Sequence, residues 1–292
     1  MTNLKMADAA IAAYSDTTDD TVRAQLAFFR AVWEGQACLS AVLAGDYDIP
    51  DSEHLKRLAS EEVAVLVDRP ADLDGRALTE AAGRMAAVMC EKGGFSEEAC
   101  DALQDVNWAS VCGPAAAVAG KYPEAYVDSA YAVLRQAELP DDALQAATSA
   151  VSLGLRALLD PIAEGVMRAR CAAGLEDAHP VKCPVCGCAS TLAIVGASSE
   201  TAGGKRELWC GQCGARWAYD RVRCARCGTR NQGHLHYYHI DGDDNHRLQT
   251  CDECGGYTRT VFQEDLLMPV CPDVEDVVMV KLDAVAAQHI GS

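Results

Sequence analysis

The feature that most constrains this chain is a pair of cysteine quartets in its C-terminal third. Each quartet consists of two Cys-x-x-Cys motifs separated by 23 residues, and the second repeats the first with an offset of 41 residues, from position 183 to 224. Four positions that match at one offset indicate an internal duplication. Each quartet predicts one metal site, because four thiolates complete the tetrahedron preferred by Zn²⁺ and by thiolate-bound iron. The expected ligands are Cys183, Cys186, Cys210 and Cys213 for the first site, and Cys224, Cys227, Cys251 and Cys254 for the second.

A glycine follows the second cysteine of every motif, at Gly187, Gly214, Gly228 and Gly255. This placement is typical of the rubredoxin or zinc-ribbon knuckle, a tight turn whose last residue needs a positive φ. Four thiolates saturate the ion, whereas a catalytic zinc keeps one position for water, so a structural role is favoured. Small ribbons have too little core to fold alone, and metal binding replaces the missing stability. A redox-active iron site, as in rubredoxin, is the alternative.

The sequence changes character at about residue 179. Residues 21–172 have apolar side chains every three or four positions, which predicts helices, with a break or kink at Pro161. Further on, short strands are expected at residues 192–195, 208–209, 215–219, 235–240 and 257–262, and a closing helix at 274–290. We therefore expect an α+β multidomain protein. It would have an all-α domain over residues 1–178, a rubredoxin-like module over 179–222, and a second module over 223–292 with a short C-terminal helix.

The formal net charge of −18 limits the expected partners. A surface this acidic repels nucleic acid and anionic lipid, so neither is expected to bind. The first residues lack the basic and apolar segments of a signal peptide, and the most apolar helical stretch, residues 143–162, contains Arg156 and Asp160. We therefore expect a soluble cytoplasmic protein whose 15 cysteines are metal ligands or buried thiols.

Several cysteines lie outside the quartets. Cys188 is close enough to Cys186 to replace a ligand or to react beside the metal, but a bystander role is favoured because the second repeat has Thr229 at this position. Cysteines in the helical half are expected to pack as small apolar residues; they are Cys38, Cys90, Cys100, Cys112 and Cys171. Cys271 is isolated and has no assigned role.

Two clusters of polar residues in the C-terminal third suggest further binding sites. Four histidines in the second repeat could bind a metal, although a strand surface also tolerates histidine: His234, His236, His239 and His246. Basic and aromatic residues alternate between the two quartets, which allows a nucleic-acid surface, but a solvated face or a docking surface for an acidic protein segment is favoured by the acidic chain. These residues are Lys205, Arg206, Trp209, Arg216, Trp217, Tyr219, Arg221, Arg223, Arg226 and Arg230.

The motifs themselves resemble those of the FdhE family, which are accessory proteins of formate dehydrogenase maturation. The resemblance is carried by Cys183-Pro-Val-Cys-Gly, Leu208-Trp-Cys-Gly-Gln-Cys, Arg221-Val-Arg-Cys-Ala-Arg-Cys-Gly and Thr250-Cys-Asp-Glu-Cys-Gly-Gly-Tyr, in this order and spacing. It covers about residues 180–265. This chain has Thr258-Arg259 where familiar members have a Leu-Lys pair.

This resemblance implies a cytoplasmic maturation factor that acts on the catalytic subunit of a molybdenum- or tungsten-dependent formate dehydrogenase. It also implies that the eight cysteines of the two quartets hold two metal ions, iron or zinc. The sequence has no recognisable set of nucleophile, base and oxyanion donors, which argues against an enzyme. The alternatives are a zinc-ribbon nucleic-acid-binding protein and a rubredoxin-like iron electron carrier. A homodimer is compatible with all three.

Overall fold

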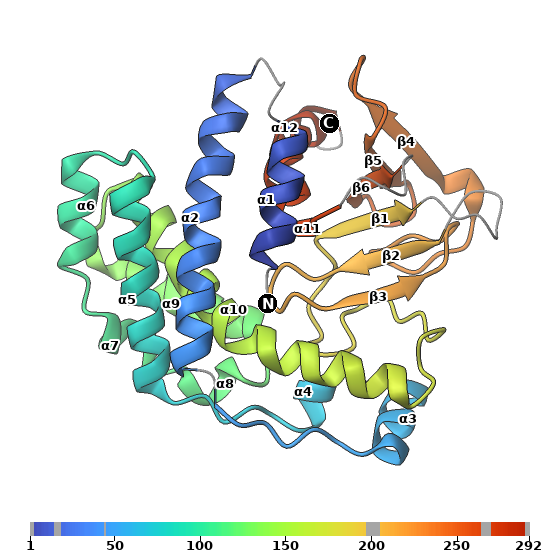
Figure 1. The fold of residues 1–292 in the computed structure, drawn as a ribbon, viewed down its shortest axis with the longest axis horizontal. Coiled ribbons are helices and arrows are strands. Elements are labelled where there is room, and N and C mark those ends of the chain that lie inside the picture. The colour runs from blue at the N-terminus through green and yellow to red at the C-terminus, as the bar shows by residue number, and fades with distance from the viewer. Residues whose placement is uncertain (1–2, 15–18, 44, 197–204, 264–269, 290–292) are drawn as a thin grey trace.

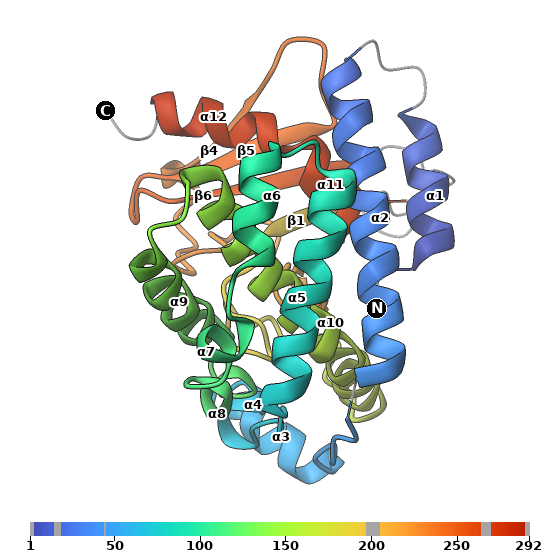
Figure 2. The same ribbon diagram turned by 90° about the vertical axis from the view of Figure 1, so that its left-hand side faces the viewer.

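The structure is a computed structural model that describes residues 3–14, 19–43, 45–196, 205–263 and 270–289. Helices form the first part of the chain, and a six-stranded sheet follows (Figures 1 and 2). The helices before the sheet are α1 (Leu4–Ala13), α2 (Asp20–Leu43), α3 (Ser52–Ser60), α4 (Val65–Asp68), α5 (Gly75–Lys92), α6 (Glu97–Gln104), α7 (Trp108–Cys112), α8 (Ala116–Ala119), α9 (Pro123–Leu134), η1 (Arg135–Ala137) and α10 (Asp141–Ala172). The α+β organisation predicted from the sequence is confirmed.

Local capping explains several of the helix starts. The carboxylate of Asp51 accepts a hydrogen bond from the amide of His54 at the start of α3, and the Ser96 hydroxyl accepts one from the amide of Ala99 at the start of α6. Both residues satisfy amide donors that the first turn of a helix leaves without a backbone acceptor. Packing then fixes the arrangement, with α10 in contact with α2, α5 and α9.

Helix α10 continues through Pro161, against the predicted break. A proline inside a helix removes one backbone hydrogen bond at a cost of about 3 kcal/mol. Here the residues on both sides of the proline are buried, among them Leu158, Leu159, Ile162 and Ala163. The burial of these apolar side chains offsets the cost, since each is worth about 1–3 kcal/mol.

The sheet has the strand order β3-β2-β1-β6-β5-β4. Its strands are β1 (Leu192–Gly196), β2 (Arg206–Trp209), β3 (Arg216–Tyr219), β4 (Leu235–His239), β5 (His246–Cys251) and β6 (Tyr257–Gln263), with a short helix η2 (Gln232–His234) before β4. Five of the six match the expected strands, whereas β5 was not predicted. Its buried residues include Gln249 and Thr250, so the strand lacks the apolar signal of its neighbours.

The internal duplication is visible in the strand order. Each repeat forms an antiparallel three-stranded unit, β1–β3 in the first and β4–β6 in the second. The units join where β1 pairs parallel with β6, in the register Leu192↔Arg259 to Gly196↔Gln263. The two repeats thus form one continuous sheet, seen along the right of Figure 1.

Three apolar clusters hold these parts together. The largest contains residues of the helices together with Cys183, Cys186, Cys210 and Cys213. A second joins α1 and α2 to α11 (Pro272–Val278), and a third packs the sheet against α12 (Val280–His289). The closing segment is therefore helical, as expected, but it is divided at Met279. No helix among the described residues is both long and apolar enough to cross a membrane.

Candidate metal centres

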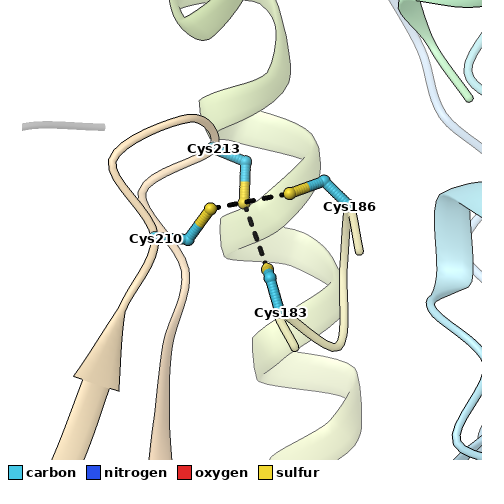
Figure 3. A group of neighbouring side chains, drawn as sticks. All are labelled: Cys183, Cys186, Cys210 and Cys213. Carbon is cyan, nitrogen blue, oxygen red and sulfur yellow. Dashed lines mark hydrogen bonds between the residues drawn. The ribbon is translucent and has the colours of Figure 1, made fainter. Parts of the chain in front are cut away.

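The first quartet, here called the inner site, joins a loop before β1 to the turn between β2 and β3. Cys183 and Cys186 lie in the loop, Cys210 and Cys213 lie in the turn, and Figure 3 shows the four side chains pointing toward one another. The Sγ atoms of Cys183 and Cys213 are 3.5 Å apart, and those of Cys186 and Cys210 are 3.6 Å apart. The structure thus brings together all four residues predicted for this site.

Each inner knuckle is shaped by its own backbone. The amide of Gly187 donates to the carbonyl of Cys183 (2.9 Å), and the amide of Gly214 donates to the carbonyl of Cys210 (2.8 Å). The two glycines have φ of 78° and 76°. Other residues are strained at these angles, which explains the glycine after each motif.

The second quartet, here called the outer site, repeats this geometry with Cys224, Cys227, Cys251 and Cys254. The Sγ atoms of Cys224 and Cys254 are 3.9 Å apart, and those of Cys227 and Cys251 are 3.8 Å apart. The amide of Arg226 also donates to Cys224 Sγ (3.3 Å), as expected for a turn that stabilises a thiolate.

The sulfur positions fit a tetrahedral metal ion at both sites. All four Sγ atoms of each quartet lie within 4.8 Å of one another. Four sulfurs about 2.3 Å from a central Zn²⁺ would be about 3.8 Å apart, close to the separations of 3.5–3.9 Å between the paired sulfurs. Iron and zinc both accept four thiolates, so this donor set accommodates either ion.

The two sites differ in burial. All four inner cysteines are buried, whereas Cys227 and Cys254 of the outer site are exposed. The inner loop is also bonded to the helical half, since the amides of Val65 and Leu66 donate to the carbonyls of Pro184 and Val185. Solvent and chelators therefore have more direct access to the outer site than to the inner site.

Protonation of the inner thiols is uneven without an ion. Hydrogen bonding, first with Cys183, holds the pKa of Cys210 well below that of an ordinary thiol, while the pKa values of Cys186 and Cys213 are raised well above it. A cation would replace this sharing of protons, because it binds all four sulfurs as thiolates.

Cys188 adds a fifth buried sulfur beside the inner site. A hydrogen bond with Cys186 lowers its pKa, but the hydrogen bond with Cys210 and burial together raise it above the usual value. Cys188 belongs to neither quartet of converging sulfurs. Its carbonyl accepts a hydrogen bond from the Cys183 amide (2.9 Å), so the backbone of Cys188 helps to close the knuckle turn.

The cysteines of the helical half differ in their burial. Cys112 is buried as expected, and Cys90 and Cys100 are partly buried. Cys38 and Cys171 are exposed, so the prediction of packing as small apolar residues is wrong for these two.

The four histidines of the second repeat do not converge. Their nearest carboxylates differ: Glu253 for His234, Asp252 for His236, Asp244 for His239, and Asp243 and Glu275 for His246. In the described part of the chain, the only groups that could hold a metal ion are the two cysteine quartets.

The basic and aromatic residues between the quartets mostly stabilise the fold. Trp209, Trp217 and Tyr219 are buried. Buried Arg206 donates from Nη1 to three backbone carbonyls, with the shortest distance to Arg223 (2.8 Å), and from Nη2 to Gln249 (2.8 Å). These bonds tie β2 to β5 and to the segment that leads to the outer site. Arg216 pairs with Glu207 and Arg230 with Asp220.

Comparisons with known proteins relate the chain to one family. No family model matches it. A Protein FdhE homolog of Shewanella sp. (strain MR-4) is 34% identical over 103 residues, which are 35% of this chain and 32% of the relative. A Protein FdhE homolog of Aquifex aeolicus (strain VF5) is 33% identical over 108 residues, 37% of each chain. The matched segments thus make up about a third of these relatives' length.

A solved structure extends the likeness to the whole fold. The crystal structure of the FdhE protein from Pseudomonas aeruginosa matches 98% of this chain and 88% of its own, with a TM-score of 0.57 and 17% sequence identity. This level of identity supports a shared fold. The chain is therefore similar to FdhE proteins, by sequence over about a third of its length and by fold over nearly all of it.

Proposed function

We propose that this chain is a maturation factor that binds the catalytic subunit of a molybdenum- or tungsten-dependent formate dehydrogenase in the cytoplasm and is needed for its activity. The proposal rests on the similarity to proteins named FdhE over about a third of the chain and on two cysteine quartets that resemble the motifs of that family. In this role the protein is not itself an oxidoreductase. The eight cysteines of the two quartets hold two ions, iron or zinc, and stabilise the fold around them.

The arrangement of the two sites suits a binding protein. Each quartet uses four cysteines for one ion, and this leaves no coordination position for a substrate. The inner site is continuous with the core of the helical half, so its ion stabilises the junction between the helices and the sheet. A rigid junction of this kind offers a preformed surface to a client.

The nucleic-acid alternative loses its main support. Stacking of bases requires exposed aromatic rings beside free cations. Trp209 and Trp217 are buried, and Arg206 is occupied by carbonyl groups inside the fold. A colourless protein that holds zinc when iron is supplied would exclude the electron carrier, because iron bound by four thiolates is coloured and zinc is not.

The proposal is tested by purifying the tagged protein from cells grown on formate. Recovery of the formate dehydrogenase catalytic subunit, together with loss of formate oxidation in a clean deletion strain that keeps the subunit's mRNA, supports the function. Normal formate oxidation in the deletion strain contradicts it. Metal analysis and an absorption spectrum of the same sample identify the ions.

A further inference from the structure

A groove of about 780 Å³ lies between the helical half and both metal centres. One wall is formed by residues 58–67 around the end of α3 and the start of α4, and another by the start of α9. The inner knuckle, the segment before it, and Cys227 of the outer site complete the lining. Its volume falls within the range of about 300–1,000 Å³ that is usual for binding pockets.

The groove contains a buried cation whose Nε lacks an acceptor. Arg170, in the last turn of α10, lines the groove and is only 3% exposed. Its Nε is fully buried without a hydrogen-bond partner among the residues that the structure describes. Burial lowers the pKa of Arg170, although the neighbouring Cys183 raises it. A buried Nε donor without an acceptor is costly, and an anion bound beside Arg170 would lower that cost.

The start of α9 supplies a second feature that favours an anion. This 12-residue helix begins at Pro123, and its preceding residue, Tyr122, makes no side-chain capping hydrogen bond. Proline has no amide hydrogen, so the donors of the first turn come from the residues after it. The partial positive charge of a helix N-terminus attracts anions, and the Glu124 carboxylate in this first turn offsets part of it. Tyr122, Pro123, Glu124 and Ala125 all line the same groove as Arg170.

The remaining walls fit a peptide better than a small anion. Apolar residues contribute much of the lining, including Leu58, Val63, Val67, Tyr122 and Val181. An inorganic anion would fill only the part of the groove beside Arg170 and leave these residues in contact with water. An extended peptide can place a carboxylate at one point and apolar side chains along the remaining length.

We propose that this groove binds an extended segment of the client protein and that a carboxylate of the segment lies between Arg170 and the first turn of α9. Apolar side chains of the segment then pack on residues 58–67 and Val181. The inference rests on the proposed function, because the client is the formate dehydrogenase catalytic subunit. It places the client's segment beside both metal centres.

A different role for Arg170 makes a different prediction. Four thiolates on a divalent ion carry a net negative charge, and Arg170 near Cys183 would balance part of it. That role gives the guanidinium a counter-charge but no hydrogen-bond acceptor. In that role, removing the Arg170 charge would weaken metal retention. Changes to other residues of the groove would not affect client binding.

The experiment measures the affinity of the purified full-length protein for the purified catalytic subunit, together with metal content and thermal midpoint. Arg170→Gln is expected to weaken binding by about 10- to 100-fold, as for a lost hydrogen-bonded charge pair. Arg168→Gln is the matched control, because Arg168 is an exposed residue of α10 that pairs with Glu164 outside the groove. Its affinity should equal that of the unaltered protein.

A second pair of variants tests the groove without touching the inner site. Tyr122→Glu places a carboxylate on an exposed groove residue and should weaken binding by repulsion, whereas Tyr131→Glu changes a similarly exposed residue of α9 outside the groove. Loss of affinity in Arg170→Gln and Tyr122→Glu, with both ions retained, supports the inference. Undiminished binding by Tyr122→Glu, with or without metal loss from Arg170→Gln, overturns the inference and leaves the proposed function standing. An unaltered protein that fails to bind the subunit overturns the proposed function as well.

Discussion

Replacing His246 is expected to make the stability of this protein less dependent on alkaline pH. His246 is buried at the start of β5, where Nδ1 lies 2.7 Å from Asp243 and Nε2 lies 2.9 Å from Glu275. The Tyr14 hydroxyl donates to the same Glu275 carboxylate (2.7 Å), and Lys281 pairs with Asp243 (3.1 Å). The cluster therefore joins the end of α1 to the sheet, α11 and α12.

The magnitude follows from the shift in pKa. Burial lowers the pKa of His246, but the hydrogen bonds and charges of Asp243 and Glu275 outweigh it and raise the pKa from 6.5 to about 9. A rise of about 2.5 units corresponds to about 3 kcal/mol, at 1.36 kcal/mol per unit. Because the pKa is higher in the folded state, this stabilisation is complete below pH 6.5 and is lost as the pH rises through about 9.

The assay is urea unfolding of the metal-loaded protein under reducing conditions between pH 6 and pH 10. The free energy of unfolding of the unaltered protein should exceed that of His246→Gln by about 3 kcal/mol at pH 6, and the two values should approach each other at pH 10. Taking this difference cancels the pH dependence of metal binding, which both proteins share. His236→Gln is the control, since His236 is exposed and its pair with Asp252 is screened by solvent. A constant difference between the unaltered protein and His246→Gln across this range would refute the reasoning.

Three further predictions concern the metal centres and the contacts around them. A chelator should remove one ion rapidly, from the site with exposed Cys227 and Cys254, while the helicity measured by circular dichroism is retained. Simultaneous release of both ions would contradict this difference in access. Arg206→Met should lower the free energy of unfolding by about 2–4 kcal/mol, because it leaves buried carbonyls and Gln249 without a donor. Denaturant unfolding measures this change, and an unchanged free energy would show that these bonds are unimportant. Gly214→Ala should lower the thermal midpoint more than Gly255→Ala does. Both glycines have positive φ, but only at position 214 would the added Cβ clash, 2.5 Å from Asp160 Oδ1. Equal shifts of the midpoint would show that backbone strain alone matters.

Features that depend on short spacings were predictable from the sequence. The two quartets and their glycines could be identified because the geometry of a knuckle is set within a few residues. Pairing of β1 with β6 links Leu192 to Arg259, far apart in the sequence, and no local pattern encodes it. The same limit hid β5, whose Gln249 is buried because its side chain bonds to Arg206 and to Tyr237. The unbroken helix at Pro161 likewise depends on tertiary packing.

The groove residues illustrate a second limit. Arg170 looks like an ordinary basic residue in the last turn of a helix, a position that favours cations. Only the folded arrangement shows that it is buried beside the inner site and that its Nε lacks an acceptor. The sequence pattern also makes all eight cysteines look alike, because the full burial of one quartet and the partial exposure of the other depend on the helical half that covers the first.

The strand order has a consequence for assembly. In the second repeat, β4, β5 and β6 are the counterparts of β1, β2 and β3. The sheet order β3-β2-β1-β6-β5-β4 therefore contains the two repeats side by side in the same orientation. The outer edge of β4 therefore corresponds to the edge of β1 that pairs with β6, and the outer edge of β3 corresponds to the edge of β6 that pairs with β1. The two ends of the sheet are complementary to each other, as in a heterologous contact that can propagate from one molecule to the next. A chain built by such a duplication must keep its own ends from meeting those of its neighbours, and this requirement acts on β3 and β4 independently of any client.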